Sequence, residues 1–178
     1  MKKSLQISKL DAAKRQLETA IRIYFFDGDP VALHTLTAAG YNVIRDINTK
    51  RSGERMMIKD QIFDYIKPEF KEMFRLKLNE AENFFKHADR DHDATLDFNP
   101  KLTELFLLDA CSQYYKLTGE FPPLFRVYQM WFMVNNQSVF NFPKEQVAIL
   151  RMNTAEMVTM GKQGFFNVAL LLLMKSGI

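Results

Sequence analysis

The segment from Gln16 to Ile47, QLETAIRIYFFDGDPVALHTLTAAGYNVIRDI, decides the fold class of this chain. At its centre DGDP (Asp27 to Pro30) ends one helix and begins the next, because Asp29 is a good N-cap and Pro30 suits the first helical position. Apolar residues recur at three- to four-residue spacing on both sides of this turn, as in amphipathic helices. The segment therefore predicts two consecutive helices with buried faces.

The first of these helices begins at a capping-box pattern, S-x-x-D, formed by Ser8 and Asp11, and runs to Phe26. Its predicted buried face consists of Leu10, Ala13, Leu17, Ile21 and Tyr24. The predicted buried face of the second helix consists of Leu33, Leu36, Gly40, Val43 or Ile44, and Ile47. A glycine in mid-helix costs roughly 1 kcal/mol relative to alanine. Gly40 therefore predicts that another helix packs closely at this position.

The rest of the chain also has helical patterns. The stretch NTKRSGER (Asn48 to Arg55) is a polar loop, and the short helical piece that follows is broken by Pro68. A long helix is predicted from Glu69 to Ala88, with its core side formed by Phe70, Phe74, Ala81, Phe84 and Phe85. Further helices are predicted over Leu102–Leu117, Leu124–Val134, Lys144–Met160 and Gln163–Met174. We expect a single all-α domain over residues 1–178, with an antiparallel helical bundle at about 8–118 and additional C-terminal helices at about 119–178.

Composition favours a helical protein, since seven glycines and six prolines leave little room for a turn-rich β architecture. Sixteen phenylalanines and ten methionines predict a bulky core, or a core together with an apolar interface. The net charge of +3 is too small to indicate nucleic-acid binding by itself, and the lone Cys111 excludes an intrachain disulfide. The N-terminus lacks a signal-peptide pattern, and the longest apolar run, Phe165 to Met174, is about half of a membrane span. These features predict a cytoplasmic protein without a membrane partner.

The stretch KHADRDHDATLDF (Lys86 to Phe98) gathers four aspartates and two histidines and resembles the calcium loop of EF-hand proteins. The residues that match the ligand positions of such a loop are Asp89, Asp91, Asp93, Thr95 and Asp97. Ala94 stands where the sharp turn uses glycine, and Pro100 stands where a glutamate closes the site. The loop is therefore a candidate for weak calcium binding, and no other cofactor is expected. The alternative is a solvated loop whose charge is partly neutralised by Lys86 and Arg90.

The residues just before this loop carry a second resemblance. AENFFKHAD (Ala81 to Asp89) resembles the signature region of HEPN domains, which are helical bundles found in many prokaryotic defence and toxin–antitoxin proteins. Active members carry an arginine, often followed by asparagine, and a histidine four to six residues after the arginine. Asn83 and His87 match the asparagine and the histidine, whereas Glu82 stands at the arginine position.

The N-terminal half is also similar to an uncharacterised bacterial branch of HEPN-like proteins. The segment Gln16–Ile47 has the two-helix pattern of that branch, and LLDACSQYYKLTG (Leu107 to Gly119) resembles the helix after the motif. The resemblance covers about residues 10–118. It implies a homodimer that binds RNA or cleaves it without a metal, and the replacement at Glu82 leaves the catalytic activity open.

The chemistry of the motif can be considered from its residues alone. Asn83 and His87 are four residues apart and therefore share one helical face. A histidine can act as the acid or base of metal-independent RNA cleavage. Asn83, or a cation supplied by Lys86 or Arg90, can hold the phosphate. Alternatively, His87 is a structural histidine at the C-terminus of the helix, where the helix dipole favours its charged form. In that case Glu82 and Lys86 simply form a surface ion pair.

Three functions remain open at this stage. The first is a HEPN-like protein that binds or acts on RNA or a nucleotide. The second is a non-catalytic module that binds a copy of itself or another protein through its apolar C-terminal helices. The third is a cation-binding protein that uses the acidic loop. Outside these sites, we expect His34 to be packed or half-exposed rather than a ligand, and Cys111 to be buried. We expect Trp131 to lie in the core or an interface, and His92 to face solvent.

Overall fold

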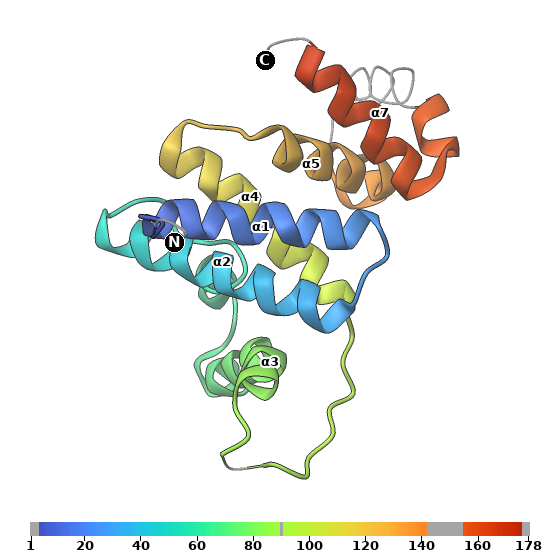
Figure 1. The fold of residues 1–178 in the computed structure, drawn as a ribbon. Helices are drawn as coiled ribbons and strands as arrows, with labels where there is room; N and C mark the ends of the chain where they lie inside the picture. The colour runs from blue at the N-terminus through green and yellow to red at the C-terminus, as the bar shows by residue number, and fades with distance from the viewer. Residues whose placement is uncertain (1–3, 90, 142–154, 176–178) are drawn as a thin grey trace.

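Two antiparallel helices, joined at the predicted DGDP turn, lie at the centre of the fold (Figure 1). The computed structural model describes residues 4–89, 91–141 and 155–175. Helix α1 (Lys9–Phe25) begins where the hydroxyl of Ser8 accepts a 3.0 Å hydrogen bond from the amide of Asp11. Helix α2 (Pro30–Lys50) begins where the Asp29 carboxylate accepts a 2.8 Å bond from the amide of Ala32. Both predicted N-caps are confirmed, whereas the Asp11 carboxylate of the expected capping box accepts a 3.1 Å hydrogen bond from Nε of Arg15.

The contact between α1 and α2 is close at Gly40. A Cβ atom added there would lie 2.9 Å from Cγ of Leu17 and 3.2 Å from the carbonyl oxygen of Ala13. No real side chain tolerates the first of these distances without movement, so the absence of a side chain lets the two helices approach. The close packing predicted at this glycine is therefore confirmed. Of the two alternatives on α2, Ile44 is fully buried and Val43 is only partly buried.

Helices α4 (Lys101–Thr118), α5 (Pro123–Asn135) and α7 (Gly161–Lys175) complete the core. Helix α4 packs against α2, and α5 and α7 pack against each other and against α1. Helix α4 ends at Gly119, whose φ of 73° allows the left-handed turn that stops the helix. The rings of Phe25, Trp131 and Phe166 meet where α1, α5 and α7 converge. The described part of the chain is all-helical, which confirms the predicted fold class.

Several finer predictions can be compared with this arrangement. Cys111 is buried, and Trp131 lies partly buried against the core, where its indole N–H donates a 3.1 Å hydrogen bond to the hydroxyl of Tyr24. The helix predicted over Lys144–Met160 falls largely outside the described residues, of which 155–159 are helical. A short 3-10 turn, η2 (Gln137–Val139), follows α5. No described helix is both long and apolar enough to cross a membrane.

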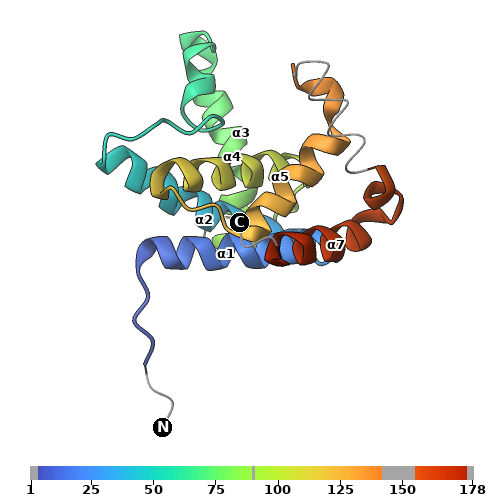
Figure 2. The ribbon, with the colours of Figure 1, turned by 90° about the horizontal axis from the view of Figure 1, so that it is seen from above.

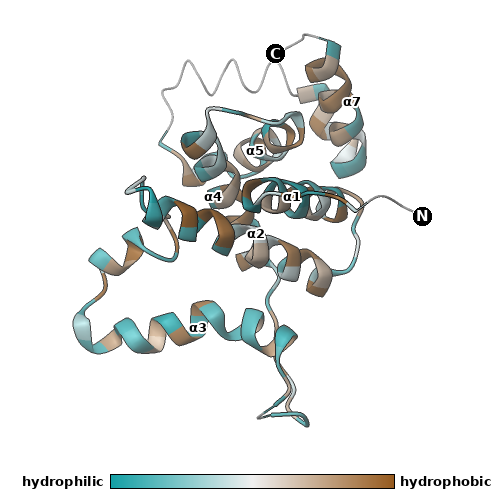
Figure 3. Ribbon diagram, turned by 60° about the vertical axis from the view of Figure 1, so that its left-hand side comes forward, coloured by the Kyte–Doolittle hydropathy of each residue, from teal (hydrophilic) through white to brown (hydrophobic). Residues whose placement is uncertain are grey.

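Helix α3 (Pro68–Lys86) lies to one side of this core, after a segment that includes the 3-10 turn η1 (Gln61–Asp64) (Figure 1). Only Leu78 and Glu82 of α3 are buried, and Figure 3 shows mainly hydrophilic residues along this helix. The predicted core side of α3 was wrong in part, because Phe70 is exposed and Phe74, Ala81, Phe84 and Phe85 are only partly buried. The reason is that α3 packs on the body mainly through α2, which covers too little of its apolar surface.

Candidate functional site

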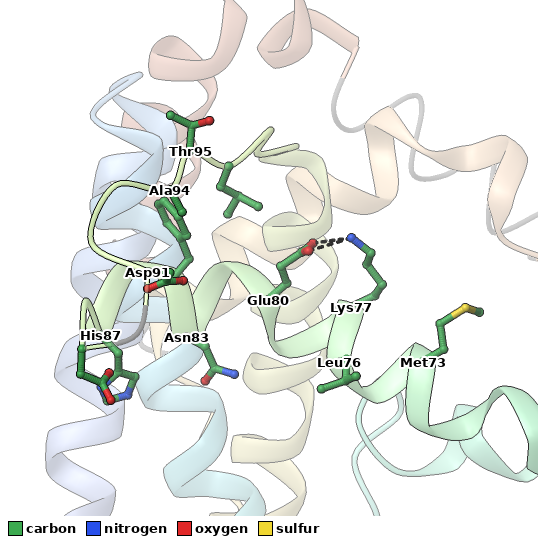
Figure 4. Close-up of a pocket in the computed structure, with 12 residues that line it drawn as sticks. Met73, Leu76, Lys77, Glu80, Asn83, His87, Asp91, Ala94 and Thr95 are labelled. Atoms are coloured by element: carbon green, nitrogen blue, oxygen red, sulfur yellow. Dashed lines mark hydrogen bonds and ion pairs between the residues drawn. The ribbon is translucent and has the colours of Figure 1, made fainter.

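An open groove runs between α3 and the loop that follows it (Figure 4). We call it the α3 groove; its volume is about 1040 Å³, and its lining residues are Met73, Leu76, Lys77, Glu80, Asn83, Phe84, His87, Asp89, Asp91, Ala94, Thr95 and Leu96. Asn83 and His87 both line it, as their four-residue spacing allows. His87 lies just past the end of α3, where its amide donates a 3.0 Å hydrogen bond to the carbonyl of Asn83. Both side chains are exposed to solvent.

Glu82, at the position of the HEPN arginine, faces the body of the protein. One of its carboxylate oxygens lies 2.8 Å from Nζ of Lys59, and the other lies 2.7 Å from Nζ of Lys86 and also accepts from the Asn42 amide. The side chains of Lys59 and Glu82 are only 5% and 10% exposed. The expected Glu82–Lys86 pair is present, but it was wrong to expect it on the surface, since Glu82 is buried against α2. Lys86 therefore holds Glu82 and does not line the groove beside His87.

The electrostatics of this cluster keep both partners charged. Burial acts to raise the pKa of Glu82, but the hydrogen bonds from Lys59 and Lys86 outweigh it and the pKa is lowered. Burial lowers the pKa of Lys59, and the bond to Glu82 opposes that change. Lys59 also lies 5.7 Å from the ring centre of Tyr41 and 5.4 Å from that of Phe106, where aromatic faces favour a cation. Lys59 and Glu82 thus form a buried ion pair that ties α3 to the body.

A second buried cluster fixes the segment that carries Lys59. The hydroxyl of Tyr41 donates a 2.7 Å hydrogen bond to the Asp109 carboxylate, which also accepts from the Ile58 amide at 3.1 Å. The Lys59 amide donates to the Tyr41 hydroxyl at 3.1 Å. Burial raises the pKa of Asp109, although these donors oppose the change. Sequence reasoning missed this cluster, and the available signal was a lone aspartate in the apolar run of α4, Phe106 to Cys111.

His34 is a packed core histidine, the first of the two alternatives predicted for it. Its Nδ1 lies 2.8 Å from the hydroxyl of Thr103, and its ring meets those of Phe85 and Phe98 edge to face. Its Nε2 is buried without a hydrogen-bond partner in the described part of the chain. Burial lowers the pKa of His34, which favours the neutral ring. The contacts of His34 with Phe85, Phe98 and Thr103 hold the end of α3, the loop after it and the start of α4 against α2.

The acidic loop lacks the left-handed turn that a calcium loop makes at its sixth position. Ala94 stands at the position that needs the left-handed turn, yet among the described residues other than glycine only Asp27 and Ser52 have positive φ. The four aspartates of the loop are exposed, and Asp93 lies 3.0 Å from the ring of the exposed His92. Over the described ranges, no three acidic, histidine or cysteine side chains are grouped so that they could hold a metal ion. Calcium binding by residues 89–97 remains a prediction.

Comparisons with known proteins found no match to a family model, a curated protein or a solved structure. The resemblances to HEPN domains and to an EF-hand loop therefore stay predictions.

Proposed function

We propose that the protein is a non-catalytic helical module whose α3 groove binds a polypeptide segment with apolar and basic side chains. The observation that carries the proposal is the pairing of exposed apolar side chains with carboxylates on one groove. Met73 and Leu76 are 57% and 58% exposed, and they line the groove together with Asp89 and Asp91. Apolar side chains exposed in a concave site are typical of a surface that a partner covers.

The charge of the groove favours a cationic partner. The charged residues that line the groove are Glu80, Asp89 and Asp91, which are acidic, and Lys77, which is basic, so the formal net charge of the lining is −2. The lysine that lines the groove, Lys77, is 2.7 Å from Glu80 and is neutralised by it. Such a field repels a polyanion such as RNA and attracts lysine or arginine side chains.

RNA binding or cleavage is the second candidate function, and the placement of Asn83 and His87 along one groove favours it. In that case His87 would supply the acid or base, and Asn83 would donate a hydrogen bond to the phosphate. The arginine that active HEPN proteins use is replaced by Glu82, which is paired inward with Lys59. This position therefore offers the groove no cation, and we rank RNA below a basic polypeptide.

Titration with two probes separates these functions. One probe is a synthetic peptide of alternating lysine and leucine, and the other is a single-stranded RNA oligonucleotide. We expect the peptide, and not the RNA, to shift the backbone amide resonances of Met73, Leu76 and Phe84. The variant Leu76→Asp should lose this response. The matched control is Leu172→Asp on α7, which changes a side chain of similar exposure, 54%, outside the groove lining.

The outcomes are distinct. If the wild type cleaves the RNA and His87→Ala does not, RNA cleavage replaces polypeptide binding as the function of the groove. Peptide binding that survives Leu76→Asp, or an absence of any response to the peptide, would refute the groove as a polypeptide site.

A further inference from the structure

The residues that precede α1 form an extended arm. Residues 4–8, the N-terminal arm, have no helical structure and are exposed, and Figure 2 shows them running away from the body. Leu5 is 75% exposed and Ile7 is 48% exposed. In an extended chain alternate side chains point to the same side, so Leu5 and Ile7 share one face and Ser4, Gln6 and Ser8 share the other. The arm therefore presents an apolar face that its own molecule leaves in water.

The chemistry of the arm complements that of the α3 groove. The sequence around the arm contains three lysines, Lys2, Lys3 and Lys9, and the first acidic residue is Asp11. Leu5 and Ile7 supply the apolar side chains that Met73 and Leu76 of the groove could cover. The nearby acidic loop, with its net negative charge, attracts the lysines.

The arm projects away from the body of its own molecule. In Figure 2 it leaves the start of α1 and points outward from the helices. An arm that projects in this way is placed to meet the groove of a neighbouring molecule.

We infer that the N-terminal arm of one copy of this protein binds in the α3 groove of a second copy. This inference rests on the proposed function of the groove and names its partner. A two-fold arrangement makes the exchange reciprocal, so each copy donates one arm and receives one. The contact is small, because each arm offers two apolar side chains, and the resulting dimer is expected to dissociate in the micromolar range or above.

Analytical ultracentrifugation of the full chain over about 10 µM to 1 mM tests this exchange. We expect a monomer–dimer equilibrium in the wild type. The arm variant Leu5→Asp/Ile7→Asp and the groove variant Leu76→Asp should each raise the dimer Kd by about tenfold or more. Leu172→Asp serves as the control and should leave the Kd unchanged. All four positions are exposed, so these variants are expected to fold, and circular dichroism checks this.

Mixing the arm variant with the groove variant gives the sharpest result. The groove variant keeps an intact arm and the arm variant keeps an intact groove, so a mixed dimer retains one of the two contacts. We expect the mixture to dimerise more tightly than either variant alone. A wild type that stays monomeric, a dimer that the arm variant does not weaken, or a mixture that gains nothing would each overturn the inference. If the lysine–leucine peptide still binds the groove in that case, the proposed function stands and only its partner is wrong.

Discussion

Lys59→Met is the most informative perturbation of this fold, because Lys59 forms the buried ion pair that fixes α3. The substitution keeps an unbranched apolar side chain that is one heavy atom shorter, and it removes the ammonium charge together with its hydrogen bonds to Glu82 and Asn42. It leaves the Glu82 carboxylate, with a side chain 10% exposed, without its 2.8 Å partner. Breaking a buried pair by removing one charge costs roughly 3 to 5 kcal/mol. We expect about 3 kcal/mol, since Lys86 at 2.7 Å still pairs with Glu82.

The loss should be concentrated in α3. Only Leu78 and Glu82 of this helix are buried, so apart from these residues and the contact of Phe85 with His34 little opposes its separation from α2. Amide hydrogen exchange of α3 should accelerate by about 100-fold, the equivalent of about 3 kcal/mol. Amides in the middle of α1, where Leu17 and Ile21 are fully buried, should change much less. Hydrogen exchange measured for each residue by NMR gives the exchange rates of α3 and of α1 in one experiment.

The double variant Lys59→Met/Glu82→Leu provides the control. Buried ion pairs replaced by apolar residues of similar size are often neutral in stability, so the second substitution should restore most of the loss. The coupling between the two sites should therefore be large. Two results would show that this pair does not hold α3. One is an exchange rate of α3 that is the same in Lys59→Met as in the wild type. The other is a double variant whose loss of stability equals the sum of the losses of the two single variants.

Other measurements test separate parts of the structure. Gly40→Ala should lower the free energy of unfolding, measured by urea titration, by about 1 kcal/mol, because overpacking against Leu17 exceeds the gain in helix propensity. A stabilised variant would contradict the close approach of α1 to α2 at Gly40. Burial lowers the pKa of His34 from 6.5, so the unfolded chain binds more protons and the free energy of unfolding should fall as pH drops below about 6.5. His34→Gln should remove this part of the dependence of stability on pH. An equal dependence in both proteins would refute the contribution of His34. His87→Ala should leave stability within about 0.5 kcal/mol, because the side chain is exposed, and a larger loss would mean that His87 supports the fold. Calorimetry with millimolar calcium tests the weak binding predicted for the acidic loop. Heat above dilution that disappears in Asp91→Asn would establish a site there, and heat no greater than dilution would refute it.

Local interactions account for the part of the fold that could be predicted. The caps at Ser8 and Asp29, the turn at DGDP and the glycine that ends α4 all act within a few residues of chain. The same holds for the apolar face of α1, most of which is buried as its spacing indicates. Gly40 predicted a close helix contact for a simple reason: only a required approach offsets its cost in mid-helix.

The candidate site was predictable only in part. Asn83 and His87 share one side of α3 because of their spacing, and the structure places both along one groove. Which side of α3 faces inward was not predictable, since Glu82 is charged and Phe70 is apolar, yet Glu82 is buried and Phe70 is exposed. The burial of Glu82 depends on Lys59, which lies in a different segment of the chain.

By itself, then, the sequence determined the helices, their ends and the close packing of α1 on α2, because caps, turns and apolar spacing are properties of neighbouring residues. Only the tertiary structure decided which charges are buried and where the groove lies. The buried charges of Lys59, Glu82 and Asp109 are stable only with partners from other helices or from the segment before α3. These partners cannot be identified from the pattern of neighbouring residues in the sequence. The groove exists because the buried ion pair holds α3 at the edge of the core, which leaves the apolar residues Met73 and Leu76 of α3 in solvent.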